Sequence, residues 1–157
     1  MRHRIPRTWI VVVDGRHAKV WECRDTSGAI VPVPEMSLEA ADQSSFSRSL
    51  KSDRPGRAFS SMGERRSAIE PKSDPHTFEK AVFARTIAEK LNEAFQKQAF
   101  RRLILIAPPA MLGHLRKMLP EAVTDTLVGE VAKELAHHDA DEIFQRARPY
   151  LLNTATA

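Results

Sequence analysis

The chain has 157 residues, of which 42% are hydrophobic and 28% are charged. This length suffices for one domain with its own core, and the composition lies far from that of disordered chains. We therefore expect a single domain over residues 1–157, with its core between about residues 8 and 148 and a tail at 149–157. The net charge of +4 and the pI near 9.5 permit an anionic partner such as RNA without requiring one.

The single cysteine, Cys23, excludes an internal disulfide, which suits a reducing cytoplasm. The basic N-terminus and the apolar run Trp9–Val13 resemble the start of a signal peptide, but the run ends at Asp14 and is shorter than the roughly 7–15 apolar residues of such a segment. No stretch approaches the roughly 20 apolar residues that span a bilayer. We expect a cytoplasmic protein with no membrane partner.

Residues 8–25 predict two strands around a tight turn. The valines at 11–13 are β-branched, Asp14-Gly15 is a favoured turn pair, and strand-forming residues resume from Val20. A third strand is predicted in "AIVPVPEM", residues 29–36. Its two prolines cannot donate ladder hydrogen bonds, so we expect an edge strand or one that ends early.

A long basic loop is expected at residues 37–73, where the periodic pattern stops. Serines crowd its first half, and Pro55-Gly56 and Gly63 follow. A short helix is compatible with Leu38–Asp42. Loops of this length inside a domain are usually functional or disordered.

The clearest predicted element is a helix that Asp74 caps and Pro75 begins. Apolar residues then recur at helical spacing on one face, namely Phe78, Val82, Phe83, Ile87, Leu91, Ala94 and Phe95. "LILIA", residues 103–107, is typical of a central strand buried on both sides. Pro108-Pro109 ends this strand and starts a second helix, with Leu112, Leu115, Met118 and Leu119 facing inward.

The segment "VTDTLVGEVAKELA", residues 123–136, fits either a helix or a strand by its own pattern. Asp139 then caps a last helix. The element order is β-β-β, a long loop, α-β-α, the ambiguous segment and α. This order predicts an α/β fold with a mixed sheet and helices on its faces.

Several stretches together resemble the bacterial host-attachment protein family, named for proteins required for attachment to host cells. They are "VVVDGRHAKVWEC", "RPGRAF", "EPKSDPH", "FARTIAEKL", "LILIAPPAMLGHLR" and "VAKELAHHDADEI". The resemblance runs from about Trp9 to Arg148. "EPKSDPH" and the "APP" and "LG.LR" pattern are its most specific parts.

This family is in turn similar to the middle domain of archaeal and eukaryotic peptide-chain release factors, with the same order of elements. The resemblance implies a ribonuclease H-like fold (β-β-β-α-β-α-β-α, with the long loop after the third strand) and a strand at Thr126–Glu134. In release factors the corresponding loop carries a Gly-Gly-Gln motif, which enters the ribosomal peptidyl-transferase centre. The motif is absent here, which places peptide release itself in doubt.

The leading hypothesis is therefore a non-catalytic module that binds the ribosome or structured RNA through the basic loop. Arginine and lysine can bind phosphates and Phe59 can stack on a base, so the expected RNA- or anion-binding residues are Arg54, Arg57, Phe59, Arg65, Arg66 and Lys72. One alternative is a hydrolase acting on a peptidyl-tRNA-like ester. Another is a protein-interaction module with an indirect role in host attachment.

No catalytic residue, metal ligand or cofactor is predicted. Asp14 could mark a ribonuclease H-type metal site, but such sites need several converging carboxylates, and only Glu130 and Glu134 are further candidates. "HHDAD", His137–Asp141, lacks a CxxC or HExxH framework, and its Asp139 is better explained as a helix cap. We also expect no DNA partner.

Overall fold

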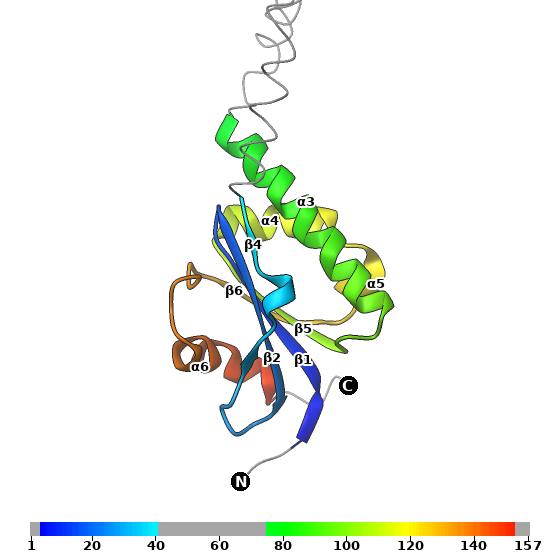
Figure 1. Ribbon diagram of the computed structural model, residues 1–157, viewed down its shortest axis with the longest axis vertical. Coiled ribbons are helices and arrows are strands. Elements are labelled where there is room, and N and C mark those ends of the chain that lie inside the picture. Colours follow the sequence, from blue (N-terminus) through cyan, green and yellow to red (C-terminus); the bar gives the residue numbers. More distant parts are fainter. Residues whose placement is uncertain (1–3, 41–74, 153–157) are drawn as a thin grey trace, which may run out of the picture.

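The computed structural model describes residues 4–40 and 75–152, in which helices cover both faces of a mixed sheet (Figure 1). In chain order, the elements are β1 (Arg4–Val13), β2 (His17–Asp25), β3 (Val31–Pro32), the 3-10 helix η1 (Pro34–Met36), β4 (Leu38–Glu39), α3 (Pro75–Gln96), β5 (Arg102–Ala107), α4 (Pro109–Met118), α5 (Glu121–Thr124), β6 (Leu127–Ala132) and α6 (Ala140–Leu151). The predicted α/β class and mixed sheet are confirmed.

The strand order in the sheet is β3-β2-β1-β5-β6, and β4 also pairs with β2. β1 and β2 form an antiparallel hairpin, whereas β1–β5 and β5–β6 are parallel pairs. Parallel strands require crossover connections, and here the helices supply them. As a result, β1, β5 and β6 all end at one edge of the sheet, which we call the carboxyl edge.

Side-chain alternation along β1 divides the core into two layers. Trp9, Val11 and Val13 pack with α3, α4 and α5 on one face of the sheet. Ile10 and Val12 pack with α6 on the other face. Both sides of the central strands are therefore buried, which explains the continuous apolar runs in β1 and β5.

Helix α3 begins at Pro75 as predicted, and its buried residues include Phe83, Ile87 and Leu91. The prediction was wrong for Phe78, whose side chain is among the exposed large hydrophobic ones. Phe78 lies in the first turn of a helix whose N-terminal end extends past the sheet (Figure 1). The first turn of α3 therefore does not pack on the sheet, although Phe78 fits the apolar pattern of the helix.

The elements expected in the second half of the chain are confirmed. All residues of β5 are buried, α4 buries Leu112 and Leu115, and the ambiguous segment forms the strand β6. Asp139 caps α6, because its side chain accepts a hydrogen bond from Glu142 N at 3.0 Å. The short helix α5 was not predicted.

Three boundaries differ from the sequence-based expectation. The third strand is reduced to the two residues Val31–Pro32 and is an outer strand of the sheet, a position in which proline is tolerated. The short helix considered at Leu38–Asp42 is wrong where the structure describes it, because Leu38–Glu39 pair with β2 as a strand. Helix α6 continues to the buried Leu151, so the expected tail does not begin at 149.

Across residues 4–40 and 75–152, the helices include no candidate for a membrane span.

Candidate functional site at the carboxyl edge

The carboxyl edge of the sheet brings together two segments that are far apart in sequence. One is the turn at residues 14–16 between β1 and β2, and the other is the loop at residues 133–139 between β6 and α6. In open α/β sheets, ligands bind preferentially at the carboxyl ends of parallel strands. The side chains at this edge are therefore the first place to look for a site.

Asp14 is the structural centre of this edge. It directly follows Val13 in the chain, and strand alternation places its side chain on the opposite face of the sheet, the α6 side. This side chain is only 8% exposed. Its Oδ1 accepts hydrogen bonds from the backbone N–H groups of Arg16 and His17, both at 2.6 Å, and its own N–H donates to His17 O at 2.9 Å. These bonds close the turn, as Asp does in many tight turns. They hold Oδ1 in place, and they do not involve the second carboxylate oxygen, Oδ2.

Two imidazoles approach Oδ2 of Asp14. His17 Nδ1 lies 3.4 Å from it, and His137 Nε2 lies 3.5 Å from it. The two rings have centroids 5.4 Å apart and meet edge to face at 69°. His17 is 36% exposed and His137 is 70% exposed, so the cluster opens to solvent on the side of His137.

The Nδ1 atom of His17 is buried and makes no hydrogen bond to the part of the chain that the structure describes. A buried polar nitrogen without a hydrogen bond costs free energy, on the order of 1–3 kcal/mol. Asp14, His17 and His137 each offer one ligating atom, and these atoms lie within 4.8 Å of one another. The arrangement can bind a cation, or it can hold and move a proton between carboxylate and imidazole.

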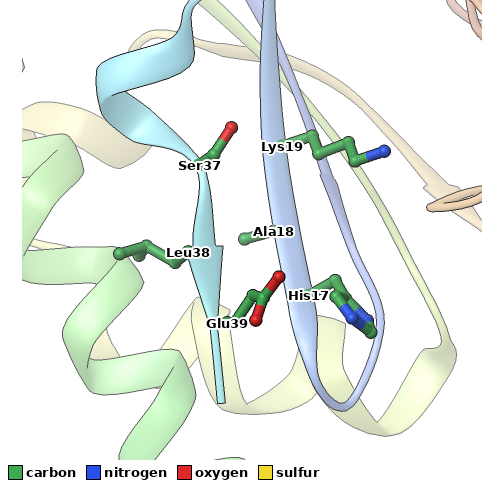
Figure 2. Close-up of a pocket in the computed structure, with 6 residues that line it drawn as sticks. All are labelled: His17, Ala18, Lys19, Ser37, Leu38 and Glu39. Carbon is green, nitrogen blue, oxygen red and sulfur yellow. The ribbon is translucent and has the colours of Figure 1, made fainter. Parts of the chain in front are cut away.

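A surface pocket of about 340 Å³ is lined by His17 and other residues of the paired strands β2 and β4. His17 pairs with Glu39 across the two strands, and their side chains line the pocket together (Figure 2). Directly opposed residues on neighbouring strands project from the same face of a sheet. Glu39 therefore adds a carboxylate next to the cluster without belonging to it.

Glu130, considered above as a possible metal-binding acid, is engaged elsewhere. Arg116 of α4 binds its carboxylate through two guanidinium nitrogens, with Nε 2.9 Å from Oε1. This hydrogen bonding raises the pKa of the Arg116 guanidinium. Glu130 is therefore paired with Arg116 of α4.

Two further groups have shifted pKa values, and both lie within the α6 side of the sheet. Burial raises the pKa of the Cys23 thiol, and burial lowers that of the Arg102 guanidinium. Cys23 is fully buried in the core, and Arg102 donates to Tyr150 O at 2.8 Å. Neither group belongs to the carboxyl edge, so we assign them structural roles.

The predicted RNA-binding residues Arg54, Arg57, Phe59, Arg65, Arg66 and Lys72 lie outside the described residues. The described residues on either side of their segment are Ala40 and the N-terminal turns of α3, and both lie near the carboxyl edge. Ala40 N donates to Arg16 O at 2.6 Å, directly beside the Asp14 turn. On the other side, a Cβ added to Gly15 would lie 3.3 Å from Cε of Lys80 in α3.

Sequence reasoning missed the pairing of His17 with His137. His17 carried no recognisable motif, and the stretch His137–Asp141 was set aside because it lacks a CxxC or HExxH framework. The available signal was topological: His17 follows the turn after the first strand, and His137 follows the last strand. If those strands are parallel, both residues must lie near the same edge of the sheet.

A model of a protein family described as "Protein required for attachment to host cells" matches residues 9–146, which is most of the chain. The chain belongs to this host-attachment family. The matched range includes the Asp14 turn, the segment 41–74 and the loop that carries His137.

This host-attachment family member is also similar to an uncharacterized protein of Rickettsia prowazekii (strain Madrid E). The two are 32% identical over 80 residues, which cover 49% of this chain and 53% of the relative. The match thus spans about half the length of that curated relative.

Proposed function

We propose that this host-attachment family member is a non-catalytic module that binds structured RNA, free or in the ribosome, in the cytoplasm. The binding surface consists of residues 41–74 and the cations of the carboxyl edge. The observation that carries the proposal is that the described residues on either side of this basic segment, Ala40 and the N-terminal turns of α3, both lie beside the β1–β2 turn. In this proposal the protein affects host attachment only indirectly, through its binding to RNA inside the cell.

The charge of the segment supports this proposal. Between residues 41 and 75 the sequence has seven basic and five acidic residues, so a surplus of two positive charges is concentrated there. Arginine binds phosphate through a planar fork of donors, and an aromatic ring such as that of Phe59 can stack on an unpaired base. Arg54, Arg57, Arg65, Arg66 and Lys72 are the proposed phosphate contacts.

Exposed cations at the described part of the edge also support it. They are Arg16, Lys19, Lys80 and Lys133, and none of them forms an ion pair with another described residue. Phosphate contacts from such residues position a protein on RNA and make its affinity dependent on salt.

A ribonuclease H-like fold and a distant relation to release factors are part of the same proposal. The order of strands and helices and the mixed sheet support a ribonuclease H-like fold and a relation to the middle domain of release factors. Segment 41–74 then corresponds to the loop that those factors insert into the ribosome. It lacks the Gly-Gly-Gln motif, which is why we propose binding without peptide release.

The test is binding of the full chain to ribosomes and to purified tRNA and rRNA at increasing salt. We expect binding that weakens steeply as the salt concentration rises, with a slope that reports the number of phosphates contacted. Replacing Arg54, Arg57, Arg65 and Arg66 together by Ala should abolish it. Absence of co-sedimentation and of salt-sensitive binding would refute the proposal.

A matched control removes the same charge from the opposite end of the sheet. Arg4, Arg24, Lys97 and Arg101 are exposed, and they lie near the amino ends of β1 and β5, the end of β2 and the end of α3. Replacing these four by Ala lowers the net charge equally. If the control loses as much affinity as the loop variant, the binding reflects overall charge and not this surface.

A second candidate is hydrolysis of a peptidyl-tRNA-like ester, which the Asp14, His17 and His137 cluster favours. An imidazole beside a buried carboxylate is a common general base for activating water. The assay is release of labelled peptide from peptidyl-tRNA on stalled ribosomes. Turnover no faster than in buffer, under conditions where the protein binds, eliminates this candidate and leaves the binding module.

A further inference from the structure

We propose that Asp14, His17 and His137 form a binding site for one divalent transition-metal ion, with Zn²⁺ as the first choice. The proposal does not rest on RNA binding. It rests on the geometry of three donor atoms contributed by the β1–β2 turn and the β6–α6 loop.

The donor separations match a tetrahedral zinc site. Zinc bonds to imidazole nitrogen and carboxylate oxygen are about 2.0–2.1 Å long, so neighbouring ligand atoms in a tetrahedron lie about 3.3–3.4 Å apart. Asp14 Oδ2 lies 3.4 Å from His17 Nδ1 and 3.5 Å from His137 Nε2. All three atoms lie within 4.8 Å of one another. A tetrahedral site also requires the two ring nitrogens to lie at a similar separation, and movement of the exposed His137 would adjust that distance.

Two of the three donors are held in advance. The backbone hydrogen bonds to Oδ1 fix the Asp14 carboxylate and leave Oδ2 available to the imidazoles. His17 Nδ1 is buried without a hydrogen bond to any described residue, and it lies next to that oxygen. A cation at this point would give the nitrogen a partner and would balance the buried carboxylate. A bound cation would therefore supply the interactions that these side chains lack.

The donor set selects the class of metal. Imidazole nitrogen suits zinc, copper, nickel and iron, whereas calcium and magnesium prefer sites made of oxygen. Two imidazoles with one carboxylate is also a ligand set that zinc sites use when a fourth position stays open. Because His137 is 70% exposed, that fourth position faces solvent at the carboxyl edge.

A simple ion pair accounts for this arrangement less completely. A simple ion pair needs only one imidazole beside Asp14, and His17 already lies 3.4 Å from the carboxylate. The second comes from a loop more than a hundred residues later and approaches the same oxygen atom. Oδ2 and the two ring nitrogens lie close enough together to serve as ligands of one cation.

The test uses the full chain without a polyhistidine tag, stripped with EDTA and titrated with Zn²⁺ by calorimetry. We expect one equivalent to bind, with an increase in melting temperature, because a ligand that binds the folded state stabilises it. Titration with Co²⁺ should give the intense visible absorption of a tetrahedral complex. Binding without saturation at one equivalent, or a weak octahedral Co²⁺ spectrum, would overturn the proposal.

Neighbouring histidines supply a matched pair of variants. His137→Ala should weaken Zn²⁺ binding by at least about 100-fold, since even the loss of outer partners of metal ligands costs about 10–100-fold. His138→Ala removes the adjacent exposed imidazole and should leave the affinity unchanged. Both positions are exposed, so both variants should fold. Equal losses in the two variants would mean non-specific binding and refute the site.

Asp14→Asn tests the carboxylate separately from the turn. Asparagine keeps an Oδ1 acceptor for the N–H groups of Arg16 and His17, but it replaces Oδ2 by an amide nitrogen. We expect loss of Zn²⁺ binding with a native circular dichroism spectrum. Unchanged Zn²⁺ affinity in this folded variant would contradict the proposed ligand set.

Discussion

The ring of Tyr150 in α6 packs directly against the backbone of Gly129 in β6. A Cβ atom at Gly129 would lie 2.8 Å from Cδ2 of Tyr150 and closer still to Cγ and Cδ1. The tyrosine hydroxyl reaches Glu130 O at 3.3 Å, and the Tyr150 carbonyl accepts from Arg102. Gly129 is therefore required for α6 to dock on the sheet.

Gly129→Ala should destabilise the protein by about 1–3 kcal/mol, because the added methyl group forces the Tyr150 ring out of its packed position. The measurement is the free energy of unfolding in urea. Gly113→Ala is the control: it lies inside α4, and apart from its chain neighbours and its own helix backbone no atom lies within 4 Å of the added Cβ. Alanine also favours helix over glycine by about 0.5–1 kcal/mol. Equal effects of the two substitutions would contradict this account of α6 docking.

Asp14 should stabilise the β1–β2 turn whether or not a metal is bound. In EDTA, Asp14→Ala should lower the free energy of unfolding by about 2–4 kcal/mol, because two backbone N–H groups lose a charged acceptor. Asp14→Asn keeps the acceptor and should cost clearly less. Urea denaturation of both variants measures the difference. If both cost the same, the charge of Asp14 and not the turn geometry is what matters.

The Cys23 thiol gives a pH dependence with a definite sign. Burial raises its pKa in the folded state, so the folded protein holds this proton more tightly than the unfolded chain does. Its contribution to stability is fully present below about pH 8.5, the ordinary thiol range, and is lost as the pH rises through the raised folded pKa. The unfolding free energy of the wild type relative to Cys23→Ala should therefore fall as the pH rises above the ordinary thiol range.

Thiol reactivity checks the same point independently. Thiolate is the reactive form, so Cys23 should react with an aromatic disulfide reagent far more slowly in folded protein than in urea. The charge of Arg102 lowers the pKa of this thiol, but by less than burial raises it. Equal rates in folded and unfolded protein would show that the thiol is accessible.

Local patterns in the sequence were enough to predict most of the fold. The Asp14-Gly15 turn, the buried strand β5 and the Asp139 cap each depend on residues close together in the chain. β4 could not be predicted, because a two-residue strand at Leu38–Glu39 exists only through its pairing with β2. Such pairing is a tertiary contact with no local signal.

The candidate site was harder to predict for the same reason. His17 and His137 are separated by most of the chain, and only the parallel arrangement of β1, β5 and β6 brings them to one edge. Asp14 was recognised, but its partners were sought among carboxylates and not among imidazoles. Residues such as Arg54 were proposed from charge and family resemblance, and they lie outside the described part of the chain.

Phe78 and Phe83 both lie at the helical spacing of the apolar stripe of α3, but only one of them is buried. Phe83 is buried against the sheet, whereas Phe78 is 60% exposed. Phe83→Ala should therefore cost about 3–5 kcal/mol through lost burial and cavity formation. Phe78→Ala should change stability by no more than about 0.5 kcal/mol, as surface substitutions do. Urea denaturation measures both, and a large loss in Phe78→Ala would mean that its ring packs against part of the protein.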